Sequence, residues 1–74
     1  MARRIISVNG TKVEEILSDS NLTLAEIGAK ADLSKNTIYR ILAGEMVRPK
    51  TVHKLCEGLG IKPRDIIVEI KKIG

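Results

Sequence analysis

The chain has 74 residues, enough for a single domain, residues 1–74, that buries only about 60% of the surface its unfolded form exposes. Apart from one aromatic residue, Tyr39, its large apolar side chains are almost all aliphatic, which favours small helices packed closely together. One tyrosine makes no stacking platform, so recognition of single-stranded nucleic acid by base stacking is disfavoured. No segment approaches the ~20 consecutive apolar residues of a membrane span, which excludes the membrane-spanning class.

The net charge of +4 is concentrated in one part of the chain. Residues 33–54 contain five basic residues and one acidic residue, whereas the basic and acidic residues of the remaining chain balance. An ordinary solvated surface would scatter its charges along the sequence. A positive segment of this kind is typical of a face that binds a polyanion.

Cysteine and histidine offer little for catalysis or metal binding. The lone Cys56, with no apolar leader near the N-terminus, indicates a reduced compartment, the cytoplasm. His53 lies three residues before Cys56, so the two could touch, but Cys56 falls on the apolar stripe of its helix. No third group orients them as a nucleophile pair, and no further ligands complete a metal site. We therefore expect neither an enzyme nor a cofactor.

The first expected helix runs from Thr11 to about Asp19. Glu14 follows Thr11 at the spacing of a capping box, in which each side chain accepts a hydrogen bond from the other residue's backbone N–H. Asn21 can close this helix in the left-handed conformation, which Asn adopts more readily than most residues.

A second and a third helix follow with a very short connection in "AKADLSKNTIYRIL". Thr23 and Glu26 repeat the capping-box spacing, and Ser34 is an N-cap for the third helix. Asp32 lies where the chain leaves the second helix, with an expected positive φ, and Leu33 fills the corner. So tight a connection makes the two helices cross steeply, which predicts a helix-turn-helix. The small residues Gly28 and Ala31 are expected to let these two helices approach.

The rest of the chain predicts a fourth helix and two strand-like ends. The segment "EMVRPK" is an exposed loop, and Pro49 begins the fourth helix. Gly58 and Gly60 are stop signals, and a short fifth helix spans about Pro63 to Ile67. The β-branched runs "RIISV" and "IIVEIKKI" pair antiparallel in one interpretation. The alternatives are a longer fifth helix and a strand exchanged with a second chain.

The stretch from Leu22 to Ile61, "LTLAEIGAKADLSKNTIYRILAGEMVRPKTVHKLCEGLGI", resembles the helix-turn-helix domains of the phage lambda repressor, Cro and xenobiotic-response-element (XRE) regulators. The likeness runs from about Thr11 to Ile67. It implies a mainly α fold, a compact bundle of four to five helices whose helix-turn-helix core spans residues 23–43. In this family the third helix, here residues 34–43, enters the major groove, and the following loop touches phosphates.

The expected DNA contacts divide into two groups. On a helical wheel Asn36, Arg40 and Ala43 lie opposite the apolar stripe of the third helix, with Lys35 and Tyr39 beside them. Asn pairs with adenine, and Arg or Lys with guanine, which is the chemistry of a base-reading helix. The base-reading set is therefore Lys35, Asn36, Tyr39 and Arg40. The resemblance implies phosphate contacts by Thr23, Ser34, Thr37, Arg48 and Lys50.

Three positions depart from the family pattern. Leu24 stands where many relatives carry a DNA-contacting Gln, and Asp32 replaces the usual Gly of the turn. Glu45 occupies a position that is commonly basic, and it is followed by Met46 and Val47 in the expected exposed loop. An acidic, apolar loop repels phosphate and could instead bind a protein partner.

Two functions follow from these features. The leading interpretation is a sequence-specific, double-stranded DNA-binding transcriptional regulator of phage or prokaryotic type, acting as a homodimer on DNA. The alternative is an antirepressor or antitoxin-like modulator that uses the same fold to bind another protein, with little DNA binding.

Overall fold

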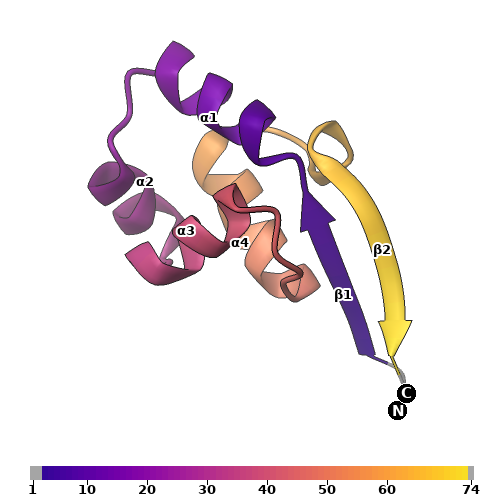
Figure 1. Cartoon of the computed structure of the whole chain (residues 1–74). Helices are drawn as coiled ribbons and strands as arrows, with labels where there is room; N and C mark the ends of the chain where they lie inside the picture. Colours follow the sequence, from indigo (N-terminus) through magenta and orange to yellow (C-terminus); the bar gives the residue numbers. More distant parts are fainter. Residues whose placement is uncertain (1–2, 74) are drawn as a thin grey trace.

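The computed structural model describes residues 3–73, and they form four helices and a small antiparallel sheet (Figure 1). Both expectations, a mainly α fold and a sheet built from the two terminal runs, are confirmed. The expected fifth helix is only a single 3₁₀ turn, which ends before Ile67 because that residue begins the second strand. The elements in order are β1 (Arg3–Val8), α1 (Gly10–Asp19), α2 (Leu24–Ala31), α3 (Lys35–Leu42), α4 (Pro49–Leu59), the 3₁₀ turn η1 (Pro63–Asp65) and β2 (Ile67–Ile73).

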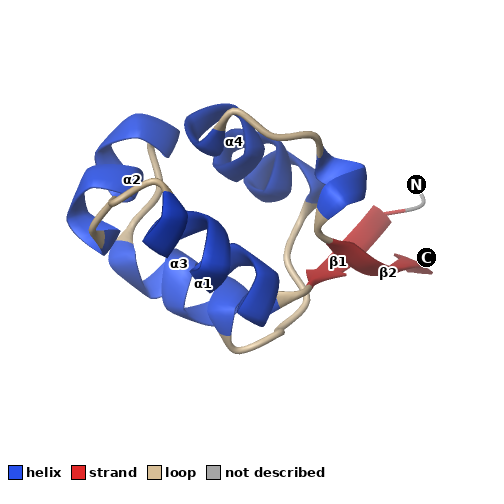
Figure 2. Ribbon diagram, turned by 90° about the horizontal axis from the view of Figure 1, so that it is seen from above, coloured by secondary structure: helices blue, strands red, loops and turns tan. Residues whose placement is uncertain are grey.

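One aliphatic core joins the helices to β1. Every helix contributes buried apolar side chains, and the strands extend away from the helical body (Figure 2). Apart from Cys56, the buried side chains of this core are aliphatic, as the composition predicts. Those with 0 or 1% exposure are Val13, Ile27, Ile38, Ile41, Val52, Leu55 and Ile66.

The first helix begins earlier than expected, and its cap is a different residue. Asn9 is the N-cap and its side chain accepts a hydrogen bond from Lys12 N at 3.1 Å, so the predicted capping box of Thr11 and Glu14 is wrong. The physical reason is tertiary: Asn9 N–H donates to the carbonyl of Ile66 at 2.8 Å, which fixes the chain where β1 ends. The left-handed conformation of Asn21 is confirmed, with φ of 58°.

The turn between α2 and α3 has the predicted geometry. Thr23 and Glu26 form a reciprocal capping box at the start of α2, and Ser34 caps α3. Asp32 has φ of 56°, which turns the chain so that Leu33 N–H donates to Gly28 O at 2.9 Å. The three residues from Asp32 to Ser34 therefore join two helices at a fixed angle.

The two small residues of α2 serve different contacts. A Cβ at Gly28 would lie 3.0 Å from Leu33 O, so this glycine does allow the turn to close tightly. Ala31 instead packs against α4, where a Cβ at Gly58 would lie only 2.9 Å from the Ala31 Cβ. Gly58 lies within α4 rather than ending it, and Gly60, with φ of 71°, ends the helix.

The sheet fastens the loop after α3 to the rest of the molecule. β1 pairs with β2 on one edge, and on its other edge Ile6 forms an isolated bridge with Val47. Val47 is 9% exposed and belongs to the core, so the expectation of an exposed Val47 is wrong, because this bridge draws the loop against β1. Glu45 is exposed, and Met46 is half-buried.

Candidate functional site

The outward face of α3 is a continuous polar stripe. Lys35, Asn36, Tyr39 and Arg40 are all exposed, and they follow one another at the spacing of a single helix face. Ile38 and Ile41 on the opposite face are buried in the core. The expected base-reading set therefore lies together on a helix whose orientation is held by its own apolar side.

The side chains at the start of α3 are held by local hydrogen bonds. Ser34 Oγ accepts from Thr37 N at 3.2 Å and lies 2.9 Å from Thr37 Oγ1. Ser34 is exposed and Thr37 is half-buried, so both hydroxyls lie at the helix terminus beside Lys35 and Asn36. One hydroxyl hydrogen is used in the bond between Ser34 Oγ and Thr37 Oγ1, so the pair offers one neutral donor at the positive end of a helix, where phosphate oxygens bind favourably.

A second group of cations lies at the far end of the loop that leaves α3. Arg48 and Lys50, both predicted to contact phosphate, share a surface hollow with Arg3 and Arg4 of β1. We call these four residues the basic cluster. Sequence reasoning missed Arg3 and Arg4, because their proximity to α4 depends on the bridge of β1 with Val47. The available signal was two consecutive arginines directly before a β-branched run.

Two carboxylates pair with cations of the positive segment, residues 33–54. Glu45 Oε1 lies 3.9 Å from Arg40 Nε, and both side chains are largely exposed. Asp32 Oδ2 lies 3.5 Å from Lys54 Nζ. Exposed pairs of this kind hold side chains only weakly, so Arg40 stays free to exchange Glu45 for another partner.

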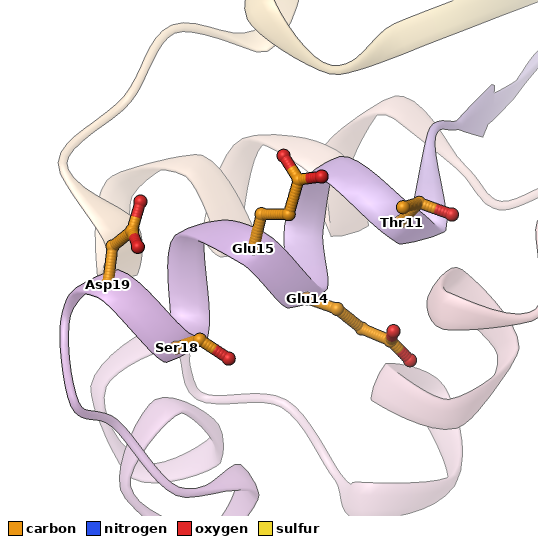
Figure 3. A pocket seen from close by; sticks show the side chains of 5 residues that line it. All are labelled: Thr11, Glu14, Glu15, Ser18 and Asp19. Carbon is orange, nitrogen blue, oxygen red and sulfur yellow. The ribbon is translucent and has the colours of Figure 1, made fainter.

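Negative charge gathers on α1 instead. This helix carries Glu14, Glu15 and Asp19 against one basic residue, Lys12. Figure 3 shows that Glu15 and Asp19 point to one side of α1, whereas Glu14 points in another direction. The carboxylates do not converge as cation ligands would, and the exposed surface of α1 repels a polyanion.

The start of α2 lies apart from the basic cluster. Thr23 and Leu24 line a hollow with Glu14, and the Glu26 carboxylate accepts from Thr23 N at 3.1 Å. Thr23 therefore lies near two acidic side chains, Glu14 and Glu26, and only its hydroxyl hydrogen remains to donate to a phosphate. Leu24 is half-buried against the core, which accounts for an apolar residue at this position.

The one cysteine is part of the core. Cys56 is 2% exposed, and burial, followed by the charge of Asp65, raises the pKa of its thiol. His53 is exposed and lies near Glu57, with 3.8 Å between His53 Nε2 and Glu57 Oε1. A buried thiol that stays protonated is a poor nucleophile.

Among residues 3–73, the polar and charged side chains available for binding therefore lie at the surface. Within that range no polar or charged side chain is buried, and no group of three or more His, Cys, Asp or Glu side chains could hold a metal ion. No helix there is long and apolar enough to cross a membrane. A helix stripe and a basic cluster on an open surface suit an extended anionic ligand rather than an enclosed small molecule.

Comparison with protein families identifies this arrangement. Residues 12–72 match the Cro/C1-type helix-turn-helix DNA-binding domain, and the match covers most of α1, all of α2, α3 and α4, and most of β2. No curated protein and no solved structure matches the chain. The predicted likeness to lambda repressor, Cro and XRE regulators is confirmed, and the chain belongs to the family of Cro/C1-type helix-turn-helix DNA-binding domains.

Proposed function

We propose that this DNA-binding domain is a sequence-specific transcriptional regulator of phage or prokaryotic type, which occupies an operator with α3 in the major groove. The observation that carries the proposal is the outward stripe of Lys35, Asn36, Tyr39 and Arg40 on a helix anchored by Ile38 and Ile41. Asn and Arg at such positions bond to the edges of adenine and guanine. A regulator of this type acts in the cytoplasm.

Phosphate contacts give this complex its affinity and its orientation. Arg48 and Lys50 lie beyond the loop after α3, and Arg3 and Arg4 extend their positive surface along β1. The capping hydroxyls of Ser34 and Thr37 stand at the N-terminus of α3. Contacts by these groups hold the backbone without reading sequence. Thr23 would contribute a single neutral donor.

A homodimer on DNA completes the proposed function. One α3 stripe reads only a few base pairs, and two copies on half-sites about 34 Å apart would read a two-fold repeat. The rival protein-binding function drew its support from an exposed apolar loop, and the burial of Val47 removes much of that surface.

Selection from random duplex DNA at near-physiological salt tests the proposal. We expect enrichment of a short duplex motif arranged as a two-fold repeat. The same selection with Arg40→Ala and Asn36→Ala protein, shown to be folded by circular dichroism, should lose or relax positions of that motif. Absence of any enriched motif at every protein concentration would overturn the proposal and favour a protein partner.

A further inference from the structure

Glu45 is the single acidic residue of the positive segment, and the backbone folds it back onto the last turn of α3. Gly44 has a left-handed conformation, with φ of 80°, and its N–H donates to Ile41 O at 3.0 Å. Glu45 N–H donates to Arg40 O, also at 3.0 Å. These two hydrogen bonds form a Schellman motif, which returns the chain to the helix that it has just left. The backbone of Glu45 is therefore bonded to the residue that ends the base-reading set.

The side chains of the same two residues also meet. Glu45 Oε1 lies 3.9 Å from Arg40 Nε, and the side chains are 56% and 68% exposed. Two residues after Glu45, the backbone of Val47 is bonded to that of Ile6. Glu45 is thus fixed on one side by the end of α3 and on the other by β1. Its carboxylate is placed beside Arg40 by the backbone, not by the ion pair alone.

The contact through Nε leaves most donors of Arg40 available. A guanidinium carries five N–H donors in a planar fork, four of them on its two terminal nitrogens. Guanine offers two acceptors in the major groove, O6 and N7, and both are uncharged. The terminal nitrogens of Arg40 can therefore bond to a guanine while Nε still faces Glu45. A carboxylate in this position opposes no negative charge on the base edge.

A phosphate is a different partner for Arg40, because it carries a full negative charge. A phosphate oxygen bound to the guanidinium would lie close to the Glu45 carboxylate, and the two anions would repel each other. Bulk water weakens this repulsion, as it weakens the exposed ion pair itself. Where the duplex excludes water, the effective dielectric constant falls and the repulsion increases. Glu45 thus opposes a phosphate on Arg40 much more strongly than it opposes a guanine.

We propose that Glu45 is a specificity-determining residue, which directs Arg40 to guanine by keeping it away from phosphates. It is a positioning residue, since it acts through Arg40. Specificity is a difference of affinities, and a repulsive element that acts on the wrong complex increases it. The guanine half of the inference rests on the proposed function, whereas the phosphate half applies to any duplex. It gives a role to an acidic residue where related domains commonly have a basic one.

The isosteric variant Glu45→Gln tests the inference in the full chain. Fluorescence anisotropy is used on the selected operator and on random duplex over a range of salt concentrations. Affinity for random duplex should rise by about three- to tenfold, and its salt slope should steepen by about one unit because Arg40 gains a phosphate contact. Affinity for the operator should stay within about twofold of the wild type, because guanine keeps Arg40. The ratio of the two affinities should therefore fall.

A double-mutant cycle shows whether the effect passes through Arg40. In an Arg40→Ala background, Glu45→Gln should change both affinities by the same factor and leave both salt slopes unaltered, because no guanidinium remains to be redirected. Asp32→Asn is the matched control. It removes the same charge near the opposite end of α3, where the carboxylate lies 3.5 Å from Lys54 Nζ, and Asn tolerates the positive φ of that position. This variant should leave the affinity ratio unchanged. Thermal unfolding followed by circular dichroism should show that all variants are folded.

Two results would overturn the inference. One is a Glu45→Gln variant that binds both DNAs more tightly by the same factor, and the other is an effect of equal size with and without Arg40. Failure here is distinguishable from failure of the proposed function. A chain that selects an operator through Arg40 but keeps its affinity ratio in Glu45→Gln contradicts only this inference. A chain that enriches no motif, yet binds random duplex more tightly in Glu45→Gln only when Arg40 is present, contradicts the regulator and supports the exclusion of phosphate.

Discussion

The backbones of Ile6 and Val47 are joined by two hydrogen bonds, from Ile6 N–H to Val47 O at 2.7 Å and from Val47 N–H to Ile6 O at 2.8 Å. This bridge ties β1 to the loop that leaves α3. It buries Val47 and brings Arg3 and Arg4 to the start of α4. The position of the basic cluster relative to α3 therefore depends on a contact between the first strand and a loop about forty residues later.

Val47→Ala should destabilise the protein because it opens a cavity beneath this bridge. We expect a loss of about 1 to 3 kcal/mol in the free energy of unfolding, measured by urea denaturation. The matched control is Glu45→Ala in the same loop, whose exposed side chain should change stability by less than about 0.5 kcal/mol. Equal stability of the two variants would contradict the burial of Val47.

Gly58→Ala should destabilise α4 although alanine is the better helix former. A new Cβ would lie 2.9 Å from the Cβ of Ala31 and 3.2 Å from its backbone, so α2 and α4 would be forced apart. The expected cost is about 1 to 3 kcal/mol in the free energy of unfolding, against a gain of up to about 1 kcal/mol from helix propensity. Adding Ala31→Gly should recover part of the loss. A variant more stable than the wild type would show that the two helices are not in close contact.

Arg40→Ala and Asn36→Ala should weaken binding selectively. On the selected operator each should cost about 1 to 3 kcal/mol, with a much smaller loss on random duplex, because bonds to base edges form only on the correct sequence. Fluorescence anisotropy titrations on both DNAs measure the difference. Lys50→Ala is the comparison, and it should weaken both DNAs alike. Equal losses on the two DNAs for Arg40→Ala and Asn36→Ala would remove α3 from base reading.

Removing Arg3 or Arg4 should act as the loss of a phosphate contact. Each Ala variant should weaken operator and random duplex together and lower the slope of log affinity against log salt by about one unit. Arg64→Ala removes the same charge from η1, at the opposite end of the sheet, and serves as the control. An unchanged salt slope for both Arg3→Ala and Arg4→Ala would exclude β1 from the DNA interface.

Because the thiol of Cys56 is buried, we expect the free energy of unfolding to fall in alkaline solution. Burial raises the pKa of Cys56 in the folded chain above its ordinary 9.0, so the unfolded chain releases the thiol proton first as pH rises. The stabilising contribution is complete below the unfolded pKa and is lost as the pH rises through the folded pKa. Cys56→Ala should flatten the fall in unfolding free energy above about pH 9, as measured by urea denaturation across pH. A wild type and variant with parallel pH profiles would contradict this shift.

Local sequence determined the parts of the fold that depend on neighbouring residues. The capping box of Thr23 and Glu26, the cap at Ser34 and the positive φ of Asp32 involve hydrogen bonds or dihedral angles within a few residues, so spacing alone predicted them. The outward stripe of α3 followed from helical periodicity, because Ile38 and Ile41 fix which face is buried. These features lie in the segment that carries the family likeness.

Only the tertiary structure decided the features that depend on distant partners. Asn9 rather than Thr11 caps α1 because Asn9 is held by Ile66, and Val47 is buried because it pairs with Ile6. Ile66 is far from Asn9 in the sequence, and Ile6 is far from Val47. No local sequence pattern could therefore indicate which residue caps α1 or whether Val47 is buried. The addition of Arg3 and Arg4 to the basic cluster follows from the bridge between β1 and Val47. In so small a domain the strand contacts determine which polar groups are left facing solvent, and hence what the surface can bind.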